Sequence, residues 1–133
     1  MVQQFGGTLD VVTADPADND GIVVVTLVGE IDMTTEKSPL AATLDIVRGG
    51  PAGLVVDLQA VTFFGSSGIN MLVAIQRVAR SRNVPFAIVA AHAVLRPLAM
   101  TGTDVLFLLC PDLPGALAAV RALPPSVPPQ SRR

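Results

Sequence analysis

The segment Gly65–Gly68 (GSSG) brings two hydroxyl groups together between glycines, an arrangement in which a serine could act as a nucleophile. The nucleophile elbow of serine hydrolases requires the pattern Gly-x-Ser-x-Gly. With Ser67 at its centre, the second glycine would fall at position 69, where the chain has Ile69. The single histidine, His92, is the only candidate base of its type, and nothing local places it beside either serine. We therefore predict no catalytic residue, with a minor enzyme role through Ser67 and His92 as an open alternative.

The other reactive residue types are too sparse for a metal or cofactor site. One cysteine, Cys110, and one histidine do not make a zinc site. No Gly-x-x-x-x-Gly-Lys-Ser/Thr pattern is present for binding nucleotide phosphates. Glu30 and Asp32 could resemble a catalytic carboxylate pair, but a helix cap with turn contacts explains them better. We predict no metal and no cofactor, and place Cys110 in or near the core with its role open.

Composition excludes several classes of partner. The 133 residues carry 9 basic and 11 acidic side chains, a net charge of −2, and contain no Trp and no Tyr. A protein that binds the phosphate backbone needs a basic excess, so we expect no nucleic-acid partner. Hydrophobic residues make up 50% of the chain and the mean hydropathy is +0.57, which excludes a disordered chain. The apolar stretches are too short to span a membrane and the N-terminus does not resemble a signal peptide, so we expect a cytoplasmic location without membrane contact.

Hydrophobic patterning predicts an α/β domain in which strands and helices alternate. Crossover helices between strands imply a mixed, largely parallel sheet, with the first two strands forming an antiparallel hairpin. We expect a domain over 1–123, followed by a flexible Pro-rich tail over 124–133. The predicted strands are Thr8–Thr13, Ile22–Ile31, Leu54–Leu58, Phe86–Ala90 and Leu106–Leu109, and the predicted helices are one containing Leu40, Ala41, Leu44 and Val47, then Ile69–Arg82, Ala93–Met100 and Leu113–Leu123.

The serine pair lies where the third predicted strand turns into a helix. The first turn of a helix has unpaired N–H groups and a positive dipole end. Ser66 or Ser67 can cap this helix when unmodified, and capping is the simpler interpretation. A phosphate there adds about −1.5 to −2 charges without melting the helix. Such a serine could therefore change the surface charge while the fold stays the same.

A helical wheel places this helix against the core by one side. The predicted core side holds Gly68, Leu72, Ile75, Val78 and Ala79. The opposite side combines polar groups with exposed apolar ones, as a modest protein interface does. It carries Ser66, Asn70, Arg77 and Ser81, with Ile69 and Val73 beside them.

Two motifs together resemble the STAS domain, and more narrowly the bacterial anti-sigma factor antagonists. The first is Val28–Asp32 (VGEID) and the second is Leu54–Ile69 (LVVDLQAVTFFGSSGI), and the likeness extends from about Leu9 to Leu123. The resemblance implies a STAS-like, four- to five-stranded sheet with four or five packed helices. It also implies a regulatory binding protein that is not an enzyme. Such an antagonist binds an anti-sigma factor, usually a serine kinase, and so frees a sigma factor.

The resemblance also identifies candidate site residues. In this family the kinase phosphorylates the first serine of the Asp-Ser-Ser-Gly turn, which is Ser66 here, the antagonist then releases its partner, and a phosphatase resets it. Gly65 replaces the family's acidic residue, so the alternative is a STAS domain that binds a partner or small ligand without phosphorylation control. The expected partner-binding residues are Asp32, Met33, Thr34, Gly65, Ser66, Ser67, Gly68, Ile69, Asn70, Val73 and Arg77.

Overall fold

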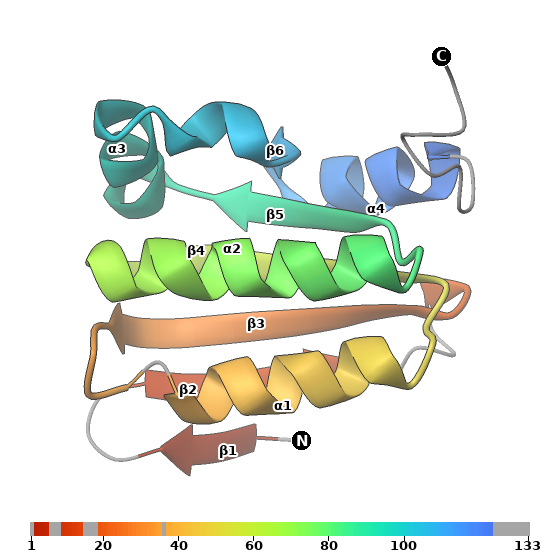
Figure 1. Ribbon diagram of the computed structural model, residues 1–133, viewed down its shortest axis with the longest axis horizontal. Helices are drawn as coiled ribbons and strands as arrows, with labels where there is room; N and C mark the ends of the chain where they lie inside the picture. The colour runs from red at the N-terminus through yellow and green to blue at the C-terminus, as the bar shows by residue number, and fades with distance from the viewer. Residues whose placement is uncertain (1, 6–8, 15–18, 36, 124–133) are drawn as a thin grey trace.

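The computed structural model describes residues 2–5, 9–14, 19–35 and 37–123, and the expected tail over 124–133 lies outside them. Within this part, six strands form one sheet in the order β1-β2-β3-β4-β5-β6 (Figure 1). The strands are β1 (Val2–Phe5), β2 (Leu9–Ala14), β3 (Ile22–Ile31), β4 (Gly53–Phe64), β5 (Phe86–Ala90) and β6 (Leu109–Cys110). The helices are α1 (Lys37–Arg48), α2 (Ser66–Ser81), α3 (His92–Met100) and α4 (Leu113–Ala122), with a short 3-10 helix η2 (Thr103–Leu106).

The sheet is mixed, as predicted. The pairs β1–β2 and β2–β3 are antiparallel, whereas β3–β4, β4–β5 and β5–β6 are parallel. The α/β class, the initial hairpin and the crossover helices are therefore confirmed. The structure adds β1 at one edge, a short strand that the sequence pattern did not indicate.

Two strands differ from their predicted bounds. We expected one strand to end at Leu58, but β4 continues to Phe64. The sequence pattern does not show this second half, because shifts in the register between β4 and β3 interrupt the regular alternation of side chains. The strand predicted over Leu106–Leu109 is wrong for its first three residues: η2 ends at Leu106, and β6 begins only at Leu109. Gly102 precedes η2 with a φ of +73°, a left-handed conformation that turns the chain away from a strand.

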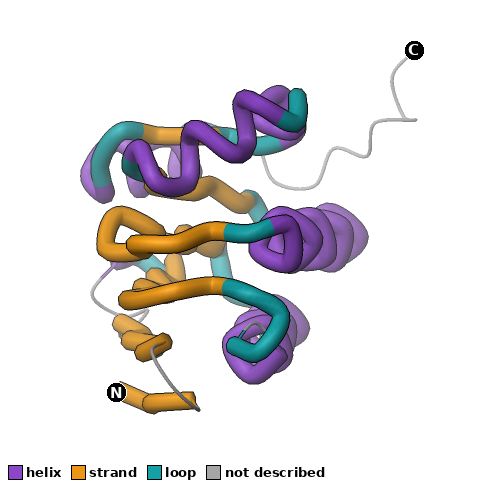
Figure 2. The backbone as a smooth tube through the Cα atoms, turned by 90° about the vertical axis from the view of Figure 1, so that its left-hand side faces the viewer, coloured by secondary structure: helices purple, strands orange, loops and turns teal. Residues whose placement is uncertain are grey.

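Helices cover the two faces of the sheet unequally (Figure 2). On one face, α1 and α2 lie side by side over the larger core, to which α3 contributes Val94 and Leu98. On the other face, α4 packs through Ala116 and Val120 on a smaller core that includes Cys110. The two cores hold the sheet rigid between them, so the loops at its edges start from fixed points.

Candidate functional site

Two loops emerge side by side at the carboxyl ends of the central strands. The strands β3 and β4 run parallel, and their last residues, Ile31 and Phe64, are partners in register. The amide of Gly65 donates a hydrogen bond of 3.1 Å to the carbonyl of Ile31, which ties the two chain exits together. The loop after β3, residues 32–35, therefore lies beside the turn that leads into α2. Asp32 and Ser66, both among the expected partner-binding residues, follow these two strand ends.

The helix α2 begins at the serines, but the serines do not cap it. Gly65 is the N-cap residue, with an extended backbone (φ −92°, ψ −173°), and no described side chain makes a capping hydrogen bond there. Its carbonyl accepts the amides of Gly68 (3.0 Å) and Ile69 (3.3 Å). Ser66 is the first helical residue and is exposed, while Ser67 is half-buried. The capping interpretation of the serines is therefore wrong, because the non-helical position that a cap must occupy falls one residue earlier.

The outer side of α2 is less apolar than the helical wheel predicted. Asn70 and Arg77 are exposed, as expected. Ile69 and Val73 are half-buried because they pack against the larger core, which α1 also reaches through Leu40 and Leu44. Met71, which the wheel left out, is buried, and Val78, which it placed in the core, is half-buried. The neighbouring helix α1 thus decides how much of α2 is free for a partner.

Hydrogen bonds hold the 32–35 loop in one shape. The Asp32 carboxylate accepts bonds from the Thr34 hydroxyl (2.6 Å) and the Thr34 amide (2.8 Å). These bonds lower the pKa of Asp32 below its ordinary value. Asp32 therefore organises its own turn and does not cap α1, which begins at Lys37. Met33 lies between these residues with 77% of its surface exposed, so the loop presents an apolar side chain beside an acidic one.

The buried residue Thr35 stabilises this loop through hydrogen bonds of its hydroxyl group. It is buried, donates its hydroxyl proton to the Glu30 carbonyl (2.8 Å) and accepts the Asp32 amide (3.0 Å). We expect Thr35→Val to lower the free energy of unfolding by about 1–2 kcal/mol, because the isosteric side chain loses both hydrogen bonds of the buried hydroxyl. Urea denaturation measures this. Thr34→Val is the matched control: it also loses a hydroxyl, but its site is exposed, so it should change stability by less than about 0.5 kcal/mol. Equal losses in both variants would contradict this role.

His92 and Cys110 make no hydrogen bond to the serine turn in the part of the chain that the structure describes. His92 is the first residue of α3 and is exposed. Cys110 is buried, and burial raises the pKa of its thiol, which makes it a poor nucleophile. Across residues 2–5, 9–14, 19–35 and 37–123, no group of three or more His, Cys, Asp or Glu side chains is arranged to hold a metal. Within the same residues, no helix has the length and apolar character needed to cross a membrane.

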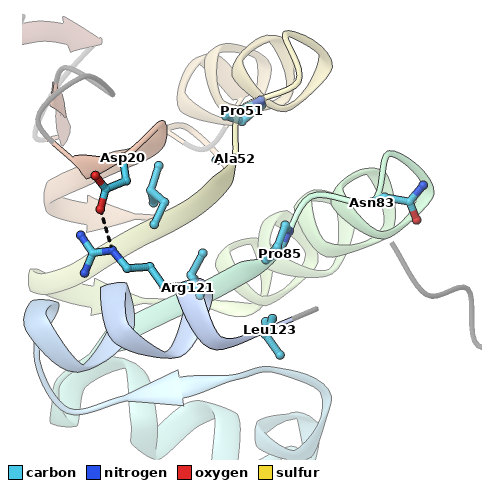
Figure 3. A pocket seen from close by; sticks show the side chains of 9 residues that line it. Asp20, Pro51, Ala52, Asn83, Pro85, Arg121 and Leu123 are labelled. Carbon is cyan, nitrogen blue, oxygen red and sulfur yellow. Dashed lines mark hydrogen bonds and ion pairs between the residues drawn. The ribbon is translucent and has the colours of Figure 1, made fainter. Parts of the chain in front are cut away.

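A shallow cavity of about 390 Å³ lies at the opposite edge of the parallel strands (Figure 3). Ile22, the first residue of β3, and Pro85, just before β5, line it together with Leu123. An ion pair of 3.1 Å between Arg121 and Asp20 borders it. A small ligand there would bind far from the serine turn, because the strands separate the two edges.

The structure adds Phe63, which sequence reasoning did not include in the site. Phe63 is 52% exposed, whereas the adjacent Phe64 is buried beneath α2. A side-chain carbon added to Gly65 would lie 3.3 Å from Cε2 of Phe63, so the ring rests against the N-cap residue of α2. The sequence held one signal for this exposed ring. Phe63 and Phe64 are adjacent, and successive side chains of a strand point to opposite faces, so only one of the two rings can face the core under α2. The irregular register of β4 hides which one.

Comparison with known proteins settles the family. A model of the STAS domain matches residues 13–116. The chain belongs to the STAS domain family. RsfB, an anti-sigma-F factor antagonist of Mycobacterium tuberculosis, is 38% identical to this STAS domain over 114 residues, which cover 84% of this chain and 92% of RsfB.

Solved structures agree with this assignment. An anti-sigma factor antagonist from Mycobacterium paratuberculosis superposes with a TM-score of 0.79 at 37% identity, covering 90% of this chain and 99% of that one. The antagonist SpoIIAA in its unphosphorylated form superposes with a TM-score of 0.69 at 16% identity, covering 86% of this chain and 98% of that one. The likeness to SpoIIAA shows a shared fold, and the STAS architecture expected from the two sequence motifs is thereby confirmed.

Proposed function

We propose that this STAS domain is an anti-sigma factor antagonist, which binds an anti-sigma factor and thereby releases a sigma factor. The observation that carries the proposal is the exposed Ser66 at the first position of α2, beside the ordered 32–35 loop. The names of RsfB and of the paratuberculosis protein, at 38% and 37% identity, support it. The protein acts as a regulatory binding partner in the cytoplasm and catalyses no reaction of its own.

The binding surface in this proposal combines the loop, the turn and the exposed side of α2. Met33 supplies an apolar contact, while Asn70 and Arg77 supply polar ones. Because the loops leave two paired strands of a rigid sheet, the surface is formed before the partner arrives and loses little conformational freedom on binding. Its residues are Asp32, Met33, Thr34, Gly65, Ser66, Ser67, Gly68, Ile69, Asn70, Val73 and Arg77.

Phosphorylation of Ser66 would switch this antagonist off, because the modified chain no longer binds the anti-sigma factor. The anti-sigma factor, acting as a serine kinase, transfers the γ-phosphoryl group of ATP to the Ser66 hydroxyl oxygen. The new O–P bond forms as the bond between the γ-phosphorus and ADP breaks, ADP leaves, and the hydroxyl proton passes to a base of the kinase. The start of a helix tolerates this added negative charge, so the fold persists. The partner, in contrast, must strip water from a dianion in order to dock again, which costs affinity. A phosphatase reverses the change by hydrolysing the phosphate ester.

Kinase assays with mapped products test this proposal. The chain is incubated with ATP and with the anti-sigma-F factor of Mycobacterium tuberculosis, and then with each anti-sigma factor encoded in the same genome as this chain. We expect one phosphoryl group, located by mass spectrometry on Ser66 and absent from Ser66→Ala. Phosphate on another residue, or binding by none of these factors, would contradict the proposal.

Gly65 favours a second candidate, in which the chain binds its partner without phosphorylation control. Glycine offers a kinase no carboxylate beside the acceptor serine. In that case the chain would co-purify with an anti-sigma factor as a stable complex, and the kinase assay would show no modification of Ser66.

A further inference from the structure

Phe63 is unlike the other phenylalanines whose side chains the structure describes. Phe64, Phe86 and Phe107 are buried, whereas Phe63 has 52% of its surface exposed. A large aromatic ring in water is unfavourable for the free protein, and such rings are enriched where proteins bind one another. The exposed ring therefore calls for a functional explanation.

The position of the ring connects it directly to the serine turn. Phe63 is the register partner of Glu30, and Phe64 of Ile31, so Phe63 points away from the core under α1 and α2. The ring lies against Gly65, since a side-chain carbon there would stand 3.3 Å from Cε2 and 3.6 Å from Cζ. Gly65, against which the ring lies, immediately precedes the first helical residue, Ser66.

Nearby side chains extend the apolar surface around this edge. Met33 projects from the adjoining loop and is exposed. Val28 in β3 lies beside its register partner Ala60 in β4, and both are exposed. None of these residues belongs to the core that α4 covers. These exposed apolar side chains are therefore not part of the core under α4, and the Phe63 ring joins the proposed binding surface at Gly65.

We propose that Phe63 is the apolar anchor of the anti-sigma factor interface, and that its burial makes the partner sensitive to charge on Ser66. This inference rests on the proposed function. The partner presents an apolar pocket that takes the Phe63 ring and excludes water from the start of α2. A charge on Ser66 then has to be desolvated inside a dry contact, where its cost is greatest. Without the ring, water stays at the turn and screens the same charge.

A double-mutant cycle tests the anchor. Affinity for the anti-sigma factors named above is measured by calorimetry for the wild type, Phe63→Ala, Ser66→Glu and the double variant. We expect Phe63→Ala to weaken binding about 30-fold, within the range of an aromatic anchor. We expect Ser66→Glu to weaken binding about 100-fold in the wild type but only about 10-fold in the Phe63→Ala background, a coupling that additive, independent effects cannot produce.

Two further variants keep the test decisive. Leu123→Ala, at the opposite edge and 40% exposed, also removes an apolar side chain but should leave affinity unchanged. Phe63→Leu keeps an apolar side chain at this position and should weaken binding only about 5-fold. Thermal unfolding of each variant checks that it is folded. If Phe63→Ala and Phe63→Leu bind as the wild type does while Ser66→Glu still weakens binding, the anchor is refuted and the proposed function stands. If the wild type binds none of the factors, the proposed function itself fails.

Discussion

Replacing Ser66 with glutamate is expected to weaken binding to the anti-sigma factor about 100-fold, whereas Ser66→Ala should bind as tightly as the wild type. Ser66 is exposed and caps nothing, so alanine removes no contact that the free domain needs. Glutamate places a charge where the partner must exclude water, beside the carboxylate of the 32–35 loop. A penalty of about 2.7 kcal/mol corresponds to that loss of affinity. Isothermal titration calorimetry measures both variants.

The control for this result is a glutamate elsewhere on the same helix. Ser81, the last residue of α2, is also exposed, but it lies at the far end of the helix from Ser66 and outside the residues of the proposed binding surface. Ser81→Glu should therefore leave affinity unchanged. Both glutamate variants should unfold close to the wild-type temperature, since neither replaces a buried side chain. Equal affinities for Ser66→Glu and Ser66→Ala would show that charge at this position does not control the partner.

The largest expected loss of stability comes from Gly68→Ala. A side-chain carbon at this position would stand 2.6 Å, 2.8 Å and 2.9 Å from three atoms of the Phe64 ring. The ring is buried in the larger core, so it cannot move aside without disturbing the packing under α2. We expect the free energy of unfolding to fall by about 2–3 kcal/mol, as overpacking of a core does. Urea denaturation monitored by circular dichroism measures the change.

Gly65→Asp is the comparison within the same turn. Its new side-chain carbon would lie 3.3 Å from the Phe63 ring, which is exposed and free to shift. An aspartate at the N-cap position also stabilises a helix. We therefore expect its stability to stay within about 1 kcal/mol of the wild type. A Gly68→Ala variant as stable as Gly65→Asp would mean that α2 can move away from the sheet at little cost.

Local sequence determined much of the site as well as the fold. The β-branched run Ile22–Ile31 forms a strand with those same bounds because such side chains suit a buried, pleated strand. The glycines and serines at 65–68 marked the start of a helix that follows a buried strand. The position of Ser66 in the first turn follows from that local pattern, and so does its exposure, because α2 turns its other side to the core.

Tertiary structure decided the surroundings of that serine. Which of the two adjacent phenylalanines turns inward depends on the register between β3 and β4, and two shifts in that register cannot be read from one strand alone. The half-burial of Ile69 and Val73 depends on a core to which α1 also contributes, a helix distant in sequence. The nearness of the 32–35 loop to Ser66 depends on β3 and β4 ending at the same edge. Residue type and spacing therefore determined the reactive group and its helix, while long-range packing determined what lies around it, because contacts between distant segments leave no local periodicity in the chain.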